Sequence, residues 1–172
     1  MKICCMKIID NFLIEDYFKE LQNLVYSNTF PWFFQKKTTT FEDDNNFMFT
    51  HTLIESQKIS SNYFLKFEPI KYFIKQHNNF DKFLRIKANL YTNQGKKIKH
   101  RKHHDWTDAN NKPHKDVKIC ILNFTSCNGV TVIKDKEVQS KENQMIFFSN
   151  EEHYGITQDD KDSRILLNIV YK

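Results

Sequence analysis

Three side chains that can bind a metal ion come from two separate parts of the sequence. His103 and Asp105 flank His104, and a third candidate, His153, follows much later in the chain. Successive side chains of an extended strand point to opposite faces, so His103 and Asp105 project together while His104 points away. Together with His153, they can supply three ligands on one face of a metal ion.

Two histidines and one carboxylate are the ligand set of non-heme Fe(II) sites that keep neighbouring coordination positions open for substrate and oxygen. The sequence therefore predicts an Fe(II) site made by His103, Asp105 and His153, with O2 as a reactant. Residues 96–104 are rich in lysine, and this basic environment favours the ionised form of Asp105.

A second group of side chains can bind a dicarboxylate beside the metal. Arg164 begins the last predicted strand, and its planar guanidinium can bind a carboxylate through two hydrogen bonds. Asn89 and Tyr91 share one face of another predicted strand, and each can donate a hydrogen bond. These three residues predict a site for 2-oxoglutarate in the mouth of a barrel.

Composition indicates one globular domain spanning residues 1–172. Hydrophobic residues make up 40% of the chain and aromatic residues 15%, which is enough for a stable core. The net charge of +5 is compatible with an anionic partner without identifying one. No apolar run has the length of a signal peptide or membrane span, so we expect no membrane partner and a cytoplasmic location, in the host cytoplasm if the chain is phage-encoded.

The cysteines favour reduced thiols over a disulfide framework or a metal site. Cys4, Cys5, Cys120 and Cys127 form no C-x-x-C pair. Cys4 and Cys5 lie in an apolar N-terminal run, residues 1–10, that is typical of a strand.

Helical periodicity is confined to the first half of the chain. Apolar residues recur at helical spacing between positions 14 and 25, with Glu15 and Asp16 in the first turn, which predicts a helix that ends near Asn28. A second periodic stretch covers residues 61–77, where Pro69 either kinks one helix or starts another.

The second half of the chain favours short β-strands. In the clearest, residues 84–91, apolar and polar side chains alternate. The expected strands cover residues 47–53, 84–91, a segment around His103, 117–124, 129–134, 144–149, 153–157 and 164–171. Because they are short and closely spaced, we expect an α+β fold: a double-stranded β-helix (a jelly roll, cupin-like) with the N-terminal helices packed on one sheet.

An ordered set of motifs resembles the Fe(II)/2-oxoglutarate-dependent oxygenases, in particular their prolyl-4-hydroxylase-like group from phages and bacteria. The resemblance covers nearly the whole chain. Its motifs are DNFL at 10–13, FPWF at 30–33, FTHTL at 49–53, RIKANLY at 85–91, HHDW at 103–106, ILNF at 121–124 and NGVT at 128–131, followed by His153 and Arg164.

This resemblance implies a function for the candidate residues. His103, Asp105 and His153 match the Fe(II) ligands, Arg164 matches the 2-oxoglutarate arginine, and Tyr91 matches a tyrosine that contacts the cosubstrate near the metal. It also implies a dioxygenase that converts 2-oxoglutarate to succinate and CO2 while hydroxylating a C–H bond. The expected substrate is a peptidyl residue such as proline, or a small amino-acid-like molecule.

Two departures from the family pattern leave alternatives open. Residues 120–122 are Cys-Ile-Leu where some prolyl hydroxylases have a second tyrosine, so the far carboxylate depends mainly on Arg164. Asn89-x-Tyr91 resembles the nucleic-acid demethylase branch, but Val170 stands where that branch has a second arginine.

The alternatives are an oxygenase acting on nucleic acid and a non-catalytic jelly-roll binding module. The basic run 96–102 could contact phosphates, although such runs are usually solvated loops. His100, His104 and His114 are expected in the same solvated region. The oligomeric state stays open.

Overall fold

The computed structural model describes residues 6–39 and 46–172, so Cys4 and Cys5 lie outside the described residues. The predicted N-terminal strand appears as β1, and Cys120 and Cys127 are buried free thiols. The elements follow in the order β1 (Lys7–Ile9), α1 (Glu15–Tyr26), β2 (Phe33–Gln35), β3 (Met48–Glu55), β4 (Lys58–Ile59), α2 (Phe64–Phe67), α3 (Ile70–Lys75), β5 (Phe83–Thr92), β6 (Lys118–Asn123), β7 (Val130–Ile133), β8 (Lys136–Gln139), β9 (Gln144–Ser149), β10 (His153–Ile156) and β11 (Ser163–Tyr171).

The helices form where apolar spacing predicted them. Helix α1 has Glu15 and Asp16 in its first turn and buries Phe18, Leu21 and Val25 along one side. In the second periodic stretch, a proline separates two short helices, α2 and α3, instead of kinking one. In the described part of the chain, no helix combines the length and apolar character needed to cross a membrane.

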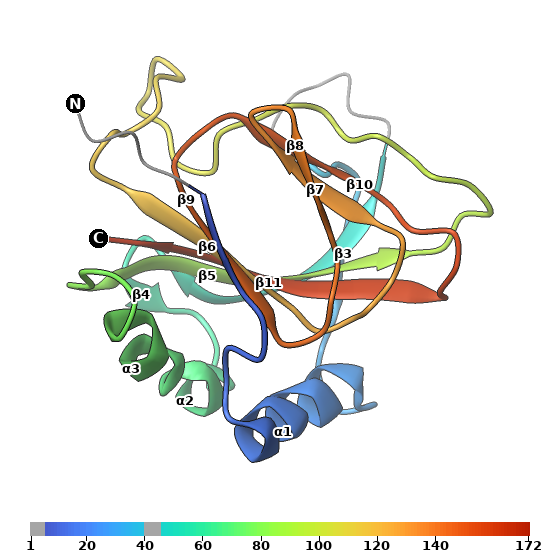
Figure 1. Cartoon of the computed structure of the whole chain (residues 1–172), viewed down its shortest axis with the longest axis horizontal. Helices are drawn as coiled ribbons and strands as arrows, with labels where there is room; N and C mark the ends of the chain where they lie inside the picture. The colour runs from blue at the N-terminus through green and yellow to red at the C-terminus, as the bar shows by residue number, and fades with distance from the viewer. Residues whose placement is uncertain (1–5, 40–45) are drawn as a thin grey trace.

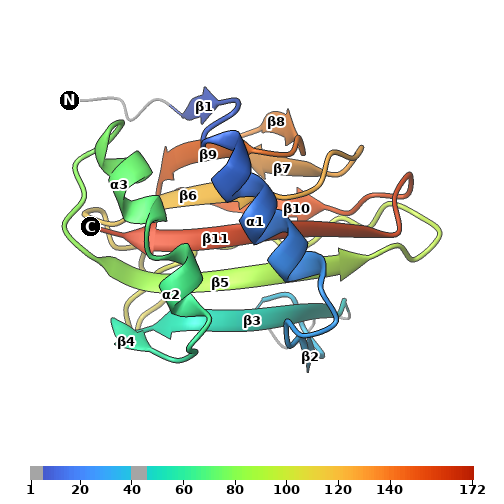
Figure 2. The same cartoon turned by 90° about the horizontal axis from the view of Figure 1, so that it is seen from below.

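Two antiparallel sheets face each other and make the predicted double-stranded β-helix. The larger sheet has the strand order β1-β9-β6-β11-β5-β3-β2, with β4 added to β3, and the smaller sheet has the order β10-β7-β8. Helices α1, α2 and α3 lie together across one face of the larger sheet, and the smaller sheet lies on its other side (Figures 1 and 2). The fold therefore matches the α+β jelly roll expected from the sequence.

Side-chain alternation along β11 divides the core into two layers. Ile165, Leu167 and Ile169 belong to the cluster under the helices, whereas Leu166 and Val170 belong to the cluster between the sheets. Arg164 and Asn168 lie on the same face of β11 as Leu166, and both are buried. The inner face of the larger sheet is thus partly polar, and the candidate site lies on this polar part.

The segment around His103 is not a strand, and this prediction was wrong. Between β5 and β6 the chain is irregular, with isolated bridges that pair Lys99 with Ile156, His103 with His153 and Thr107 with Pro113. The run from Lys96 to His104 lacks the alternating apolar side chains that would bury one face of a strand. It therefore touches the smaller sheet at single points only.

Candidate metal and cosubstrate site

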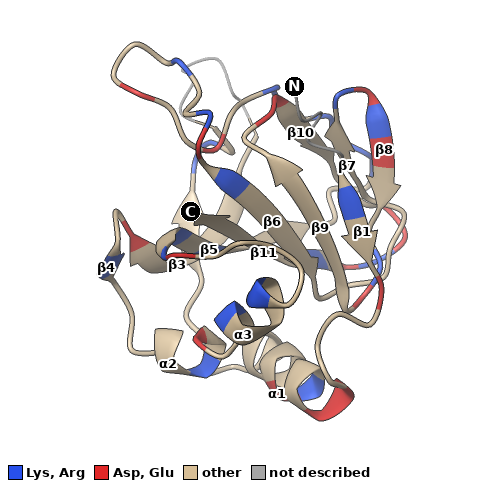
Figure 3. Ribbon diagram, turned by 60° about the vertical axis from the view of Figure 1, so that its left-hand side comes forward, with Lys and Arg blue, Asp and Glu red and all other residues tan. Residues whose placement is uncertain are grey.

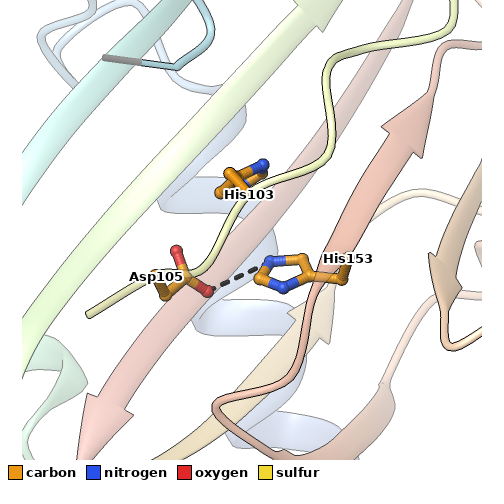
Figure 4. A group of neighbouring side chains, drawn as sticks. All are labelled: His103, Asp105 and His153. Carbon is orange, nitrogen blue, oxygen red and sulfur yellow. Dashed lines mark ion pairs between the residues drawn. The ribbon is translucent and has the colours of Figure 1, made fainter. Parts of the chain in front are cut away.

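His103, Asp105 and His153 lie together between the two sheets, as Figure 4 shows. One potential ligand atom from each lies within 4.8 Å of the others. The Nε2 atom of His153 is 3.2 Å from Oδ2 of Asp105, and the two imidazole centroids are 4.5 Å apart. His153 begins β10, whereas the other two residues come from the irregular segment before β6.

Backbone and side-chain hydrogen bonds orient both imidazoles. The amides of His103 and His153 each donate to the carbonyl of the other, at 3.0 Å. Nδ1 of His103 lies 3.1 Å from the carbonyl of Arg101, and Nδ1 of His153 lies 2.9 Å from the carbonyl of Glu151. A carbonyl only accepts, so each Nδ1 carries a proton, and Nε2 is the ring nitrogen that each histidine can offer to a metal.

Electrostatics favour the metal-binding forms of His103 and Asp105, whereas at His153 a proton competes with a metal. Burial and the neighbouring His153 lower the pKa of His103 to about 4, so its imidazole is neutral at neutral pH. Burial acts to raise the pKa of Asp105, but His153, Arg85 and His103 outweigh it and hold this pKa well below the usual range. Burial acts to lower the pKa of His153, yet the carboxylate of Asp105 raises it.

Two residues that the sequence reasoning missed hold the carboxylate of Asp105. Nη2 of Arg85 donates to Oδ1 of Asp105 at 2.6 Å and to Oδ1 of Asn168 at 3.1 Å. Nδ2 of Asn168 donates to Oδ2 of Asp105 at 2.8 Å. The alternation of residues 85–91 already places Arg85 on the face of Asn89 and Tyr91, and that signal could have identified it.

A cavity adjoins the three candidate ligands and contains the residues predicted to bind 2-oxoglutarate. It holds about 590 Å³ of empty space, part of it open to solvent. Tyr91 on β5 pairs with Arg164 on β11, and Asn89 pairs with Leu166, so the sheet register brings all four to one place. The structure therefore brings together all six residues predicted for the site.

Arg164 is a buried cation, and one of its donors has no partner among the described residues. Its Nη1 donates to the carbonyls of Val130 at 3.0 Å and Ile156 at 3.3 Å, and its Nη2 donates to Oγ1 of Thr131 at 2.9 Å. Among the described residues, its Nε–H has no hydrogen-bond partner. A buried donor without a partner costs free energy, so this side of the guanidinium fits an incoming carboxylate.

His100 lies in this cavity, which the sequence did not predict. Only 6% of it is exposed, and its ring centroid is 5.0 Å from that of Tyr91. The expectation that His100 belongs to a solvated loop was therefore wrong. The amide of His100 donates a hydrogen bond to the carbonyl of Gly155, which holds His100 against the smaller sheet. The polar sequence around His100 gives no sign of this contact.

The basic run 96–102 is partly occupied with internal contacts. Nζ of Lys97 donates to the carbonyl of Asn128 at 3.1 Å. Nζ of Lys99 lies 4.7 Å from the ring centroid of Tyr154, and Lys102 also lies over that ring. Elsewhere, basic positions are scattered over helices, strands and loops (Figure 3).

The donor set fits a divalent iron ion. Two imidazoles and one ionised carboxylate, grouped on one side, match the 2-His-1-carboxylate arrangement and leave the other coordination positions open. Hydrogen bonds from outer residues fix the ligands, as is usual at metal sites.

Comparisons with known proteins identify the fold. No family model and no curated protein matches the sequence. Among solved structures, the viral collagen prolyl hydroxylase of Paramecium Bursaria Chlorella virus-1 is 14% identical with a TM-score of 0.59, covering 96% of this chain and 94% of its own. A 2OG-Fe(II) oxygenase family oxidoreductase from Burkholderia pseudomallei is 8% identical with a TM-score of 0.68, covering 97% and 85%.

A third structure is the Trichoplax adhaerens prolyl hydroxylase in complex with a peptide fragment of hypoxia inducible factor. It is 12% identical with a TM-score of 0.62, covering 96% of this chain and 82% of its own. The agreement extends over nearly all of this chain and over 82% to 94% of the three similar structures. The chain therefore has the fold of the 2-oxoglutarate- and Fe(II)-dependent oxygenases.

Proposed function

We propose that this protein is a 2-oxoglutarate- and Fe(II)-dependent dioxygenase that hydroxylates a C–H bond. One observation carries the proposal: a two-histidine, one-aspartate group adjoins a cavity where a buried arginine has an unused N–H. A metal site alone would suit many chemistries. The guanidinium of Arg164 in the adjoining cavity favours an anionic cosubstrate, and 2-oxoglutarate is such an anion.

The side chains divide the work. His103, Asp105 and His153 would hold Fe(II), which would supply the oxidising power together with O2 as 2-oxoglutarate is converted to succinate and CO2. Arg164 binds the far carboxylate of the cosubstrate, and Asn89 and Tyr91 orient it.

The surroundings keep the ligands fixed and the site shielded. Arg85 and Asn168 hold both oxygens of the Asp105 carboxylate in place. Ile121 and Leu166 form an apolar part of the cavity wall that limits water near the reacting groups.

The substrate we propose is a peptidyl residue such as proline, or a small amino-acid-like molecule. Two of the similar structures support this choice: one is a viral collagen prolyl hydroxylase, and the other contains a peptide of hypoxia inducible factor. Both comparisons concern proteins of low sequence identity, so the support comes through the shared fold.

The test uses His103→Ala and Asp105→Ala, with His114→Ala as the matched control in the same irregular segment. Purified proteins are loaded with Fe(II) and 2-oxoglutarate without oxygen, and the weak visible charge-transfer band is recorded. Oxygen is then admitted and succinate is measured. We expect both signals in the wild type and in His114→Ala, and neither in the two ligand variants.

Two outcomes would contradict the proposal. A wild-type protein without the visible band and without succinate would favour a non-catalytic binding module. Normal turnover in both ligand variants would remove the metal assignment.

A further inference from the structure

A second groove opens beside the cosubstrate cavity and meets it at the candidate ligands. Both cavities are lined by Lys87, His103 and Asp105. The second groove is not lined by Arg164, Asn89 or Tyr91, the residues proposed to bind 2-oxoglutarate. A molecule in this groove would lie next to the metal without displacing the cosubstrate.

The described lining of this groove is polar and has more basic than acidic groups. Lys37, Arg85 and Lys87 are its cations, and Asp105 is its acid. Arg85 forms an ion pair with Asp105, so the two lysines have no acidic partner within the described lining. Five of the lining residues are threonines, whose hydroxyls also hydrogen-bond anions.

Lys87 occupies the central position of this arrangement. On β5 it lies two residues from Arg85 and two residues from Asn89, so all three point to the inner face of the sheet. Its ammonium group makes no hydrogen bond to any described residue. Burial and the neighbouring Arg85 lower the pKa of Lys87 to about 8. The nearby acids Asp105 and Glu55 act to raise this pKa, but they offset only part of the decrease.

We propose that this groove binds the substrate and that Lys87 anchors an anionic group on it, a carboxylate or a phosphate. The inference rests on the proposed oxygenase function and adds the chemical class of the substrate. A partly buried ammonium without a partner gains most from an anion that completes its hydrogen bonds. Because the groove reaches His103 and Asp105, an anchored molecule would place its neighbouring C–H bonds at the metal.

The experiment measures binding of small anions to the protein loaded with Fe(II) and saturating 2-oxoglutarate, without oxygen. The probes are N-benzoylglycine, its neutral amide and phenyl phosphate, titrated by calorimetry. The variants are Lys87→Met, Lys87→Arg and, as a control on an exposed strand outside the groove, Lys58→Met. The affinity for 2-oxoglutarate is measured in each protein from the visible band.

We expect at least one anionic probe to bind more tightly than the neutral amide, and the tighter anion distinguishes carboxylate from phosphate. Lys87→Met should weaken that binding by about tenfold or more, while Lys87→Arg and Lys58→Met retain it. Retention in Lys87→Arg shows that the charge is what matters, and an unchanged affinity of Lys87→Met for 2-oxoglutarate shows that this variant is folded.

Three results would overturn the inference: no binding of either anion, equal binding of the amide, or equal binding by Lys87→Met. An equal loss of 2-oxoglutarate affinity in Lys87→Met would also overturn it, because Lys87 would then serve the cosubstrate. Failure of the proposed function is recognised separately, since the visible band would be missing from the wild type before any probe is added.

Discussion

At the scale of single residues, the candidate metal site depends on which nitrogen of each histidine carries the proton. His103 and His153 each direct Nδ1 at a backbone carbonyl two residues earlier in the chain. The tautomer is therefore set by the backbone, before any metal arrives. This pre-set state means that metal binding has to displace at most the proton shared between His153 and Asp105.

Metal affinity should decrease in acid, with His153 as the controlling group. Its pKa is raised, so as pH falls through that value a proton competes with the metal for Nε2. The pKa of His103 is about 4 and that of Asp105 is lower than usual, so both side chains can still bind the metal until the pH is much lower. Fe(II) titrations at several pH values, without oxygen, should show a dependence on about one proton. A dependence on two protons near neutral pH would contradict this assignment.

Arg164→Lys should weaken 2-oxoglutarate binding by about tenfold or more, because an ammonium lacks the planar pair of donors. The visible band of the Fe(II) protein, followed as 2-oxoglutarate is added, measures the change. The variant also loses bonds to Val130, Ile156 and Thr131, so urea unfolding is measured alongside. An unchanged affinity in a folded variant would place the far carboxylate elsewhere.

The sequence identified the residues that we propose to bind the metal and cosubstrate, but not those that support them. For His103, Asp105 and Arg164, the residue type alone indicates the ability to bind a metal or a carboxylate. Arg85 and Asn168 matter because the register of β5 against β11 pairs Asn168 with Lys87, next to the Asp105 carboxylate. Pairing between strands far apart in sequence is not encoded locally, so alternation along one segment shows which face Arg85 lies on but not that Asn168 meets it there.

At the scale of elements, strands with a clear apolar pattern, either alternating or continuous, were predicted well and weakly patterned strands were not. Strands β5 and β9 follow the expected ranges closely. The short strands β2, β4 and β8 were missed, because each has four residues or fewer and the first two have no buried side chain. Their pairing comes from the neighbouring strand rather than from their own pattern.

Gly129, just before β7, should not tolerate a side chain. An added Cβ would lie 3.0 Å from Cδ of Arg164 and 3.2 Å from backbone atoms of Gln158 and Ile156. Gly129→Ala should therefore lower the free energy of unfolding by about 1–3 kcal/mol and weaken 2-oxoglutarate binding, because Arg164 has to shift. Urea unfolding and the visible band measure the two effects.

Gly155→Ala is the matched control on the adjacent strand β10. Its nearest neighbour would be Nδ1 of His100 at 3.4 Å, which is close to an ordinary contact. We expect a smaller change in both measurements. If the two alanine variants behave alike, the close approach of Gly129 to Arg164 has no functional importance.

At the scale of the whole molecule, the two core layers separate stability from chemistry. The layer under the helices contains no candidate site residue among those that the structure describes, whereas the layer between the sheets borders the site. Leu21 on α1 is fully buried in the first layer. Leu21→Ala should lower the free energy of unfolding by about 2–5 kcal/mol while the affinity of the folded protein for 2-oxoglutarate stays the same.

Ile14→Ala, at an exposed position before the same helix, is the control and should change stability little. Both variants are compared by urea unfolding and by the visible band. A large loss of cosubstrate affinity in folded Leu21→Ala would show that the helical layer positions the site after all.

The bridge between His103 and His153 joins an irregular segment to the smaller sheet through two backbone hydrogen bonds. Opening those two bonds separates two candidate ligands without disturbing the pairing of any strand in either sheet. The site can thus come apart by a local opening whose free energy is only part of that for global unfolding. Metal retention and fold stability are consequently two different properties of this molecule, and a bound metal acts as a cross-link that closes the segment against the sheet.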